Sequence, residues 1–123
     1  MSLALNLLVL RCKELERTRQ FYEHLGLVFI QEQHGKGPVH YASEMAGLVL
    51  ELYPATEKQL PDKTRLGFTT SQLGELADDI SRSPEIVILK PLVQQADRLV
   101  IVLQDPDGRT VEISQQLHDV KVT

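Results

Sequence analysis

The predicted elements occur in the same order twice along the chain, as a strand, a helix and three further strands. In the first half, strands are predicted over residues 5–12, 27–31, 39–44 and 48–53, with a helix over 14–25. In the second half, strands are predicted over 65–69, 86–89, 99–103 and 110–114, with a helix that begins at Ser71 and ends before Ser83-Pro84. Residues 48–52, Leu-Val-Leu-Glu-Leu, resemble residues 109–113, Arg-Thr-Val-Glu-Ile. The repeat predicts an α+β fold of two βαβββ modules that arose by internal duplication.

The length and the positions of the turn residues predict how the modules divide the chain. The 123 residues fit one domain, with module 1 at about 4–54, a linker at about 55–63 and module 2 at about 64–115. Aromatic residues make up only 5% of the chain, so we expect a mostly aliphatic core.

Charge and composition disfavour several classes of partner. The net charge is −4 and no run of Lys or Arg is present, so nucleic-acid binding is not expected. No apolar run approaches the roughly 20 residues of a membrane span. The first residues carry no signal-peptide pattern, and Cys12 is the single cysteine, which favours a cytoplasmic location.

Side chains alternate between the two faces of a strand, so each strand predicts which residues lie together. One set is apolar and is assigned to the faces under the helices: Leu8, Leu10, Leu48, Leu50, Leu52, Leu66, Phe68, Val111 and Ile113. The opposite set is mixed: Leu7, Val9, Arg11, Val49, Glu51, Tyr53, Arg65, Gly67, Thr69, Thr110, Glu112 and Ser114. An even-length hairpin loop would add His40 to this mixed face. Because buried charges are costly unless solvated or paired, we expect a curved sheet around a wet cavity, with the helices outside.

Motifs at both ends of the chain suggest a family. Residues 8–17, Leu-Val-Leu-Arg-Cys-Lys-Glu-Leu-Glu-Arg, are followed by Phe21-Tyr22 and by Leu25-Gly26-Leu27. Near the other end, the turn Asp105-Pro106-Asp107-Gly108 leads into Val111-Glu112-Ile113. Together with the repeat, this pattern resembles the glyoxalase, bleomycin-resistance and extradiol-dioxygenase group, the vicinal oxygen chelate superfamily.

The resemblance implies four metal-ligand positions, which match Leu7, Glu51, Arg65 and Glu112 in this chain. Leu7 has no donor atom and Arg65 is a cation, so this degenerate site does not favour a metal. A divalent Ni, Zn, Mn or Fe ion stays the alternative, with His40 as a replacement ligand. We expect instead that Arg65 neutralises the carboxylates of Glu51 and Glu112.

The resemblance also suggests roles for individual residues. Arg11 matches an arginine that holds a substrate carboxylate in glutathione-using glyoxalases, although it also fits a strand-end arginine; Leu7, Tyr53 and Arg65 complete the predicted ligand-binding set. If the chain is an enzyme, Glu51, Glu112 and His40 are the catalytic candidates, whereas a hydrogen-bonded structural histidine is the simpler interpretation of His40. The stretch 34–41 resembles an uncharacterised subset of the superfamily, and His34 would lie at the cavity mouth.

Three functions follow from these residues. The first is binding of a small polar or anionic ligand in the sheet cavity without a catalytic metal. The second is a metal-dependent lyase or isomerase that resembles lactoylglutathione lyase, and the third is a non-catalytic structural or regulatory domain. The resemblance also allows a homodimer, with modules that pair either within one chain or across two chains.

Overall fold

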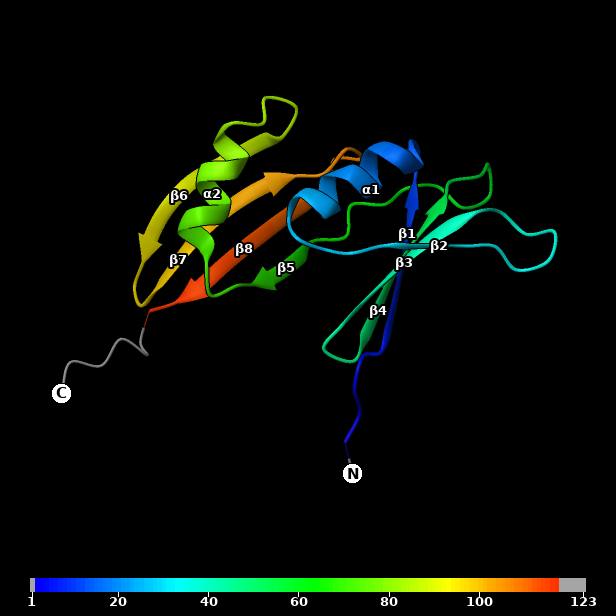
Figure 1. The fold of residues 1–123 in the computed structure, drawn as a ribbon, viewed down its shortest axis with the longest axis horizontal. Helices are drawn as coiled ribbons and strands as arrows, with labels where there is room; N and C mark the ends of the chain where they lie inside the picture. Colours follow the sequence, from blue (N-terminus) through cyan, green and yellow to red (C-terminus); the bar gives the residue numbers. More distant parts are fainter. Residues whose placement is uncertain (1, 118–123) are drawn as a thin grey trace. The chain divides into compact units, whose positions relative to one another are not determined.

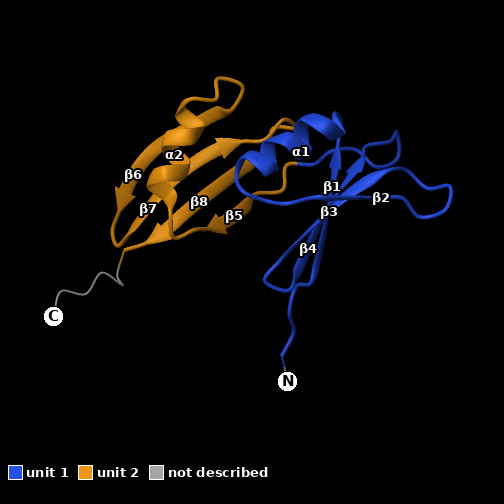
Figure 2. Cartoon of the chain, in the orientation of Figure 1, with its two compact units in different colours: residues 1–62 blue, residues 63–123 orange. Residues whose placement is uncertain are grey.

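The computed structural model describes residues 2–117. The chain divides into two compact units, residues 1–62 and residues 63–123, and the boundary falls at the end of the predicted linker (Figure 2). Each unit contains one four-stranded mixed sheet and one helix. These observations confirm the predicted α+β fold of two βαβββ modules. Whether the two units make one domain stays a prediction.

The first unit contains β1 (Leu7–Cys12), α1 (Leu15–His24), β2 (Ile30–Glu32), β3 (His40–Met45) and β4 (Leu48–Pro54). Its strands lie in the order β1-β4-β3-β2, with β1 parallel to β4 and the other neighbours antiparallel (Figure 1). Met45 pairs with Leu48, so β3 and β4 are joined by a two-residue loop. This is an even-length loop, the condition under which His40 lies on the mixed face.

A glycine ends α1 and shortens the strand that follows. Gly26 has φ +108°, a left-handed conformation that costs glycine little. The amide of Leu27 donates to the Tyr22 carbonyl at 3.2 Å and thereby closes the last turn of the helix. Since this amide serves the helix end, β2 begins at Ile30 and not at residue 27 as predicted.

The second unit repeats the order with β5 (Leu66–Thr69), α2 (Leu73–Ser81), β6 (Val87–Gln95), β7 (Arg98–Gln104) and β8 (Thr110–Gln116). Its strands lie in the order β5-β8-β7-β6, with β5 parallel to β8 (Figure 1). The sequence places the end of β6 at residue 89, but the strand continues to Gln95. Pro91 is tolerated because β6 is an edge strand with register shifts on both sides of Lys90.

The apolar faces pack against the helices as parity predicts. Leu50 and Leu52 of β4 are almost fully buried, and so are Val111 and Ile113 of β8. In the first unit α1 contacts β4, and in the second unit α2 contacts β7 and β8. Neither of these helices, within the described part of the chain, has the length and apolarity needed to cross a membrane.

Candidate functional site

Four side chains form a continuous row across the sheet of the first unit. Arg11 of β1 pairs in register with Tyr53 of β4, and His40 of β3 pairs with Glu32 of β2. The Arg11 guanidinium lies over the Tyr53 ring, 4.8 Å from its centroid. The rings of Tyr53 and His40 stack with centroids 4.1 Å apart and an angle of 9° between their planes. Ala42, two residues after His40 on β3, pairs in register with Glu51 of β4. Glu51 therefore lies on the same face of the sheet as this row.

His40 is the most enclosed member of the row, with only 1% of its surface exposed. Its Nδ1 lies 3.2 Å from the carbonyl oxygen of Pro38. A carbonyl oxygen can only accept a hydrogen bond, so Nδ1 carries the proton and donates. In a neutral ring, Nε2 then keeps its lone pair, and this nitrogen lies 3.3 Å from a carboxylate oxygen of Glu32.

His34, in the loop between β2 and β3, brings a third donor to the same place. Its Nε2 lies 3.9 Å from Glu32, and its ring centroid lies 5.1 Å from that of His40. One ligand atom from each of Glu32, His34 and His40 lies within 4.8 Å of the other two. The loop that carries His34 is held by a hydrogen bond from the Gly37 amide to the His34 carbonyl. The three residues therefore form a compact group of potential metal ligands.

In the second unit, two arginines neutralise Glu112. Arg65, directly before β5, approaches Glu112 Oε1 at 3.2 Å, and Arg98 of β7 approaches Oε2 at 3.3 Å. The side chain of Glu112 is partly buried, with 25% exposed, whereas 63% of the Arg65 side chain is exposed. One carboxylate between two guanidinium groups gives this group a local charge of +1.

The four positions at which the family resemblance implies metal ligands do not fit a metal. Leu7 is an exposed aliphatic side chain without a donor atom. At the equivalent position of the second unit, Arg65 places a cation within 3.2 Å of Glu112. A divalent ion at Glu112 would have to displace two guanidinium groups that already satisfy both of its oxygens.

Tyr41 lies on the opposite face from His40 and contacts α1. Its hydroxyl donates a hydrogen bond to Glu16, and the Arg19 guanidinium lies over its ring, 5.2 Å from the centroid. The pKa of the Glu16 carboxyl is lowered, mainly by this hydrogen bond and secondly by a hydrogen bond from Arg19. The same bond to Glu16 raises the pKa of the Tyr41 hydroxyl. Tyr41 thus anchors the helix to β3 and takes no part in the row.

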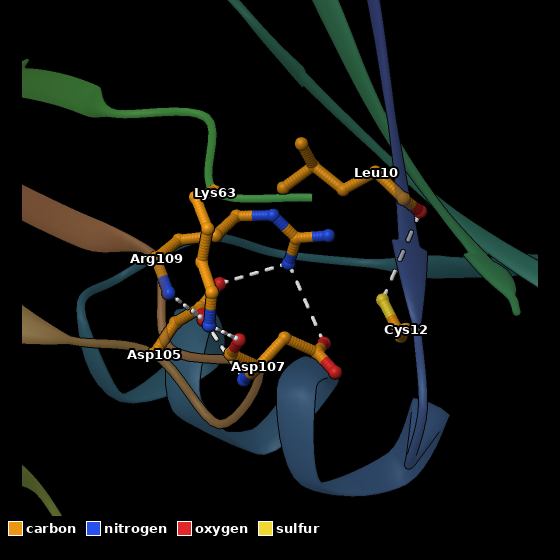
Figure 3. Close-up of polar contacts among 6 residues, drawn as sticks. All are labelled: Leu10, Cys12, Lys63, Asp105, Asp107 and Arg109. Carbon is orange, nitrogen blue, oxygen red and sulfur yellow. Dashed lines mark hydrogen bonds and ion pairs between the residues drawn. The ribbon is translucent and has the colours of Figure 1, made fainter. Parts of the chain in front are cut away.

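The turn between β7 and β8 contains a buried ion pair (Figure 3). Arg109 and Asp105 both have fully buried side chains, and Arg109 Nη1 lies 3.0 Å from Asp105 Oδ2. Asp105 Oδ1 also accepts the backbone amides of Asp107 and Arg109, each at 2.9 Å. Lys63 reaches the same turn and donates to the Asp107 carbonyl at 3.0 Å. These contacts make the pair a structural element of the hairpin.

Parity placed several residues of the row, but other partners were missed. Arg11, Tyr53, His40 and Glu51 share a face of the first sheet, while Arg65 and Glu112 meet in the second unit. Glu32 and Arg98 were not among the predicted site residues, and no contact between His34 and His40 was predicted. The available signal was the position of Glu32 and His34, two residues apart at the start of the loop that leads to His40.

Two βαβββ modules, each with charged groups on a sheet that carries one helix, define the class of paired-module α+β proteins. Residues 5–118 match the model of the glyoxalase-like domain, so the chain belongs to the glyoxalase-like domain family of the vicinal oxygen chelate superfamily. Among curated proteins, none is similar enough in sequence to this chain to support a comparison.

Solved structures share the fold along almost the whole chain. An antibiotic-binding protein from Streptomyces sp. CB03234 is 17% identical, with a TM-score of 0.76 and coverage of 94% of this chain and 98% of that one. A virulence protein from Salmonella typhimurium is 23% identical, with a TM-score of 0.70 and coverage of 94% and 98%. A glyoxalase/bleomycin resistance protein/dioxygenase from Alicyclobacillus acidocaldarius is 13% identical, with a TM-score of 0.65 and coverage of 94% and 93%. At these identities the similarity shows the fold alone.

Proposed function

We propose that this protein binds a small polar or anionic molecule, and that no metal occupies the four ligand positions suggested by the family. The observation that carries this proposal is the contact of Arg65 and Arg98 with Glu112, at 3.2 Å and 3.3 Å. Glu112 is thereby an acceptor for guanidinium groups. This arrangement supports recognition of an anion by the arginine side chains, and it does not support Lewis-acid chemistry by a metal at Glu112.

The local charge favours an anionic or strongly polar ligand. The Arg65 side chain is mostly exposed, and guanidinium offers five N–H donors in a planar fork that suits carboxylates and phosphates. In the first unit, Arg11 and Tyr53 provide a second cation beside an aromatic face. The solved structure of an antibiotic-binding protein with the same fold supports a binding role for such a scaffold.

The proposal is tested by thermal melts of the chain against a panel of small carboxylates, phosphate esters and uncharged analogues. Ligands that bind only the native state raise the melting temperature. We expect at least one anionic class to do so, and Arg65→Gln to remove most of the shift. Arg82→Gln is the matched control, because Arg82 is an exposed arginine of the same unit that pairs with Asp79.

Two outcomes would contradict the proposal. No stabilisation by any member of the panel would favour a structural or regulatory domain. Metal-dependent turnover of methylglyoxal with glutathione, abolished by Glu51→Gln or Glu112→Gln, would favour a lyase. The cytoplasmic location and the homodimer stay predictions that these melts do not address.

A further inference from the structure

We infer that Glu32, His34 and His40 form a binding site for a first-row divalent transition ion such as Zn²⁺ or Ni²⁺. This site lies entirely in the first unit, on β2, β3 and the loop between them. It shares no residue with the four ligand positions implied by the family. The inference is independent of the anion-binding proposal, because neither Arg65 nor Glu112 contributes to it.

The tautomer of His40 prepares its other nitrogen for a metal. Histidine ligands almost always donate their second ring N–H to a carbonyl or carboxylate, which fixes the ring and leaves the other nitrogen unprotonated. Nδ1 of His40 makes this contact with the Pro38 carbonyl at 3.2 Å. The buried ring is also fixed by its stacking on Tyr53. His40 is therefore a ligand whose orientation is set before any ion arrives.

The contact between His40 and Glu32 requires a positive charge. The Nε2 lone pair and the Glu32 oxygen are both electron-rich, and they lie 3.3 Å apart. This arrangement is repulsive unless a proton or a metal ion lies between the two atoms. The Tyr53 hydroxyl is 3.2 Å from Nε2, but the near-parallel rings place it above the imidazole plane, whereas the lone pair lies in the plane.

The spacing of the donor atoms favours a metal ion over a proton, because a metal ion would also bind His34. Ligand atoms at about 2.0–2.1 Å from a tetrahedral zinc lie about 3.3 Å from one another. The distance from His40 to Glu32 already equals this value. His34 is 3.9 Å from Glu32 and 75% of its side chain is exposed, so a small side-chain rotation brings its Nε2 into range.

The donor set also indicates the class of ion. Two imidazoles and one carboxylate suit zinc, nickel, cobalt and iron better than the oxygen-seeking magnesium or calcium. Three protein ligands leave at least one coordination position for water or for a small anion. With both imidazoles neutral, the group has a charge of −1, which the ion more than compensates.

The test uses the 123-residue chain without an affinity tag, stripped with a chelator and then titrated with Zn²⁺ by calorimetry. Co²⁺ serves as a second probe, because its visible absorption reports the ligand geometry. We expect one ion per chain, and we expect His34→Ala and Glu32→Gln each to weaken the affinity at least about tenfold. Both residues are at least partly exposed, so these variants avoid the folding risk of changing the buried His40.

Two control variants separate this site from other histidines and from the family positions. His24→Ala removes a histidine in the last turn of α1, and Glu51→Gln removes a carboxylate at a family ligand position. Both should retain the affinity and the Co²⁺ spectrum of the unmodified chain. Absence of stoichiometric binding would overturn the inference. Binding that survives both His34→Ala and Glu32→Gln, or that is lost in Glu51→Gln, would overturn it as well.

Discussion

Arg109 shows how one buried charge can control a turn. Its guanidinium lies 3.0 Å from Asp105 and 3.4 Å from Asp107, and none of its side chain is exposed. In the sequence, Arg109 stood out only as part of the repeated five-residue segment, although the preceding turn contains two aspartates that could pair with it. Charge pairing inside a hairpin depends on the turn geometry, which the sequence does not display directly.

We expect Arg109→Met to lower the free energy of unfolding by about 3–5 kcal/mol, because it leaves the buried Asp105 carboxylate without its guanidinium. Urea denaturation at neutral pH measures this change. Arg82→Met is the matched control: it removes an exposed arginine from an ion pair with Asp79, and it should cost no more than about 1 kcal/mol. Equal losses in the two variants would show that the buried pair has no special weight.

The candidate site could be predicted from the sequence only as far as strand alternation reaches. Alternation along β4 relates Glu51 to Tyr53, and the two-residue loop after Met45 extends this relation to His40. Glu32 lies across a longer loop, whose length does not fix the pairing of β2 with β3. Its contact with His40 therefore required the structure.

At the scale of elements, the two modules share the length of one hairpin loop and the conformation of its first residue. The β3–β4 loop and the β6–β7 loop each contain two residues, and each begins with an alanine in a left-handed conformation, Ala46 at φ 48° and Ala96 at φ 54°. Such turns match the twist of a hairpin, but they favour Asn or Gly at the first position. The second loop residue differs between the modules, since Gly47 has φ +85° and Asp97 does not have a positive φ, so the two turns are of different types.

We expect Ala46→Asn to stabilise the chain by about 0.5–1 kcal/mol, because asparagine tolerates the left-handed region that costs most L-residues about 1–2 kcal/mol. Ala46→Val should have the opposite effect, since β-branched residues rarely adopt positive φ. Thermal and urea melts of the two variants provide the measurement. A valine variant as stable as the asparagine variant would contradict this account of the turn.

The elements themselves were largely predictable, and the exceptions have local causes. The amide of Leu27 completes α1, which delays the start of β2. The predicted strand ended at residue 89, but β6 continues past Pro91 because an edge strand needs no donor on its open side. A hydrogen bond decided the boundary at Leu27 and the edge position decided it at Pro91, and hydrophobic periodicity is insensitive to both.

At the scale of the whole molecule, protection of the backbone should follow the strand order of each unit. β4 lies between β1 and β3, and β7 lies between β6 and β8, so both have neighbours on each side. Residues 56–60 lie outside the strands and are exposed. Amides in central strands open only with large parts of a fold, whereas exposed segments open locally.

We therefore expect hydrogen exchange to be slowest in residues 100–103 of β7 and 50–52 of β4, and fastest in residues 56–60. Mass spectrometry of peptides after timed labelling would measure the pattern. Residues 87–95 of β6 serve as an internal comparison, because this strand has a single neighbour and every residue is exposed. Equal protection in β6 and β7 would show that sheet position does not set the order of opening.

The interruption of β6 also affects how the molecule behaves at high concentration. A long edge strand with exposed Val87, Ile88 and Leu89 would offer a template on which strands of other molecules could assemble into fibrils. Pro91 removes one amide from that edge, and the register shifts beside Lys90 bend its line of hydrogen-bonding groups. An incoming strand would lose its hydrogen-bond ladder after a few residues, so the interruption at Pro91 also protects the chain against aggregation.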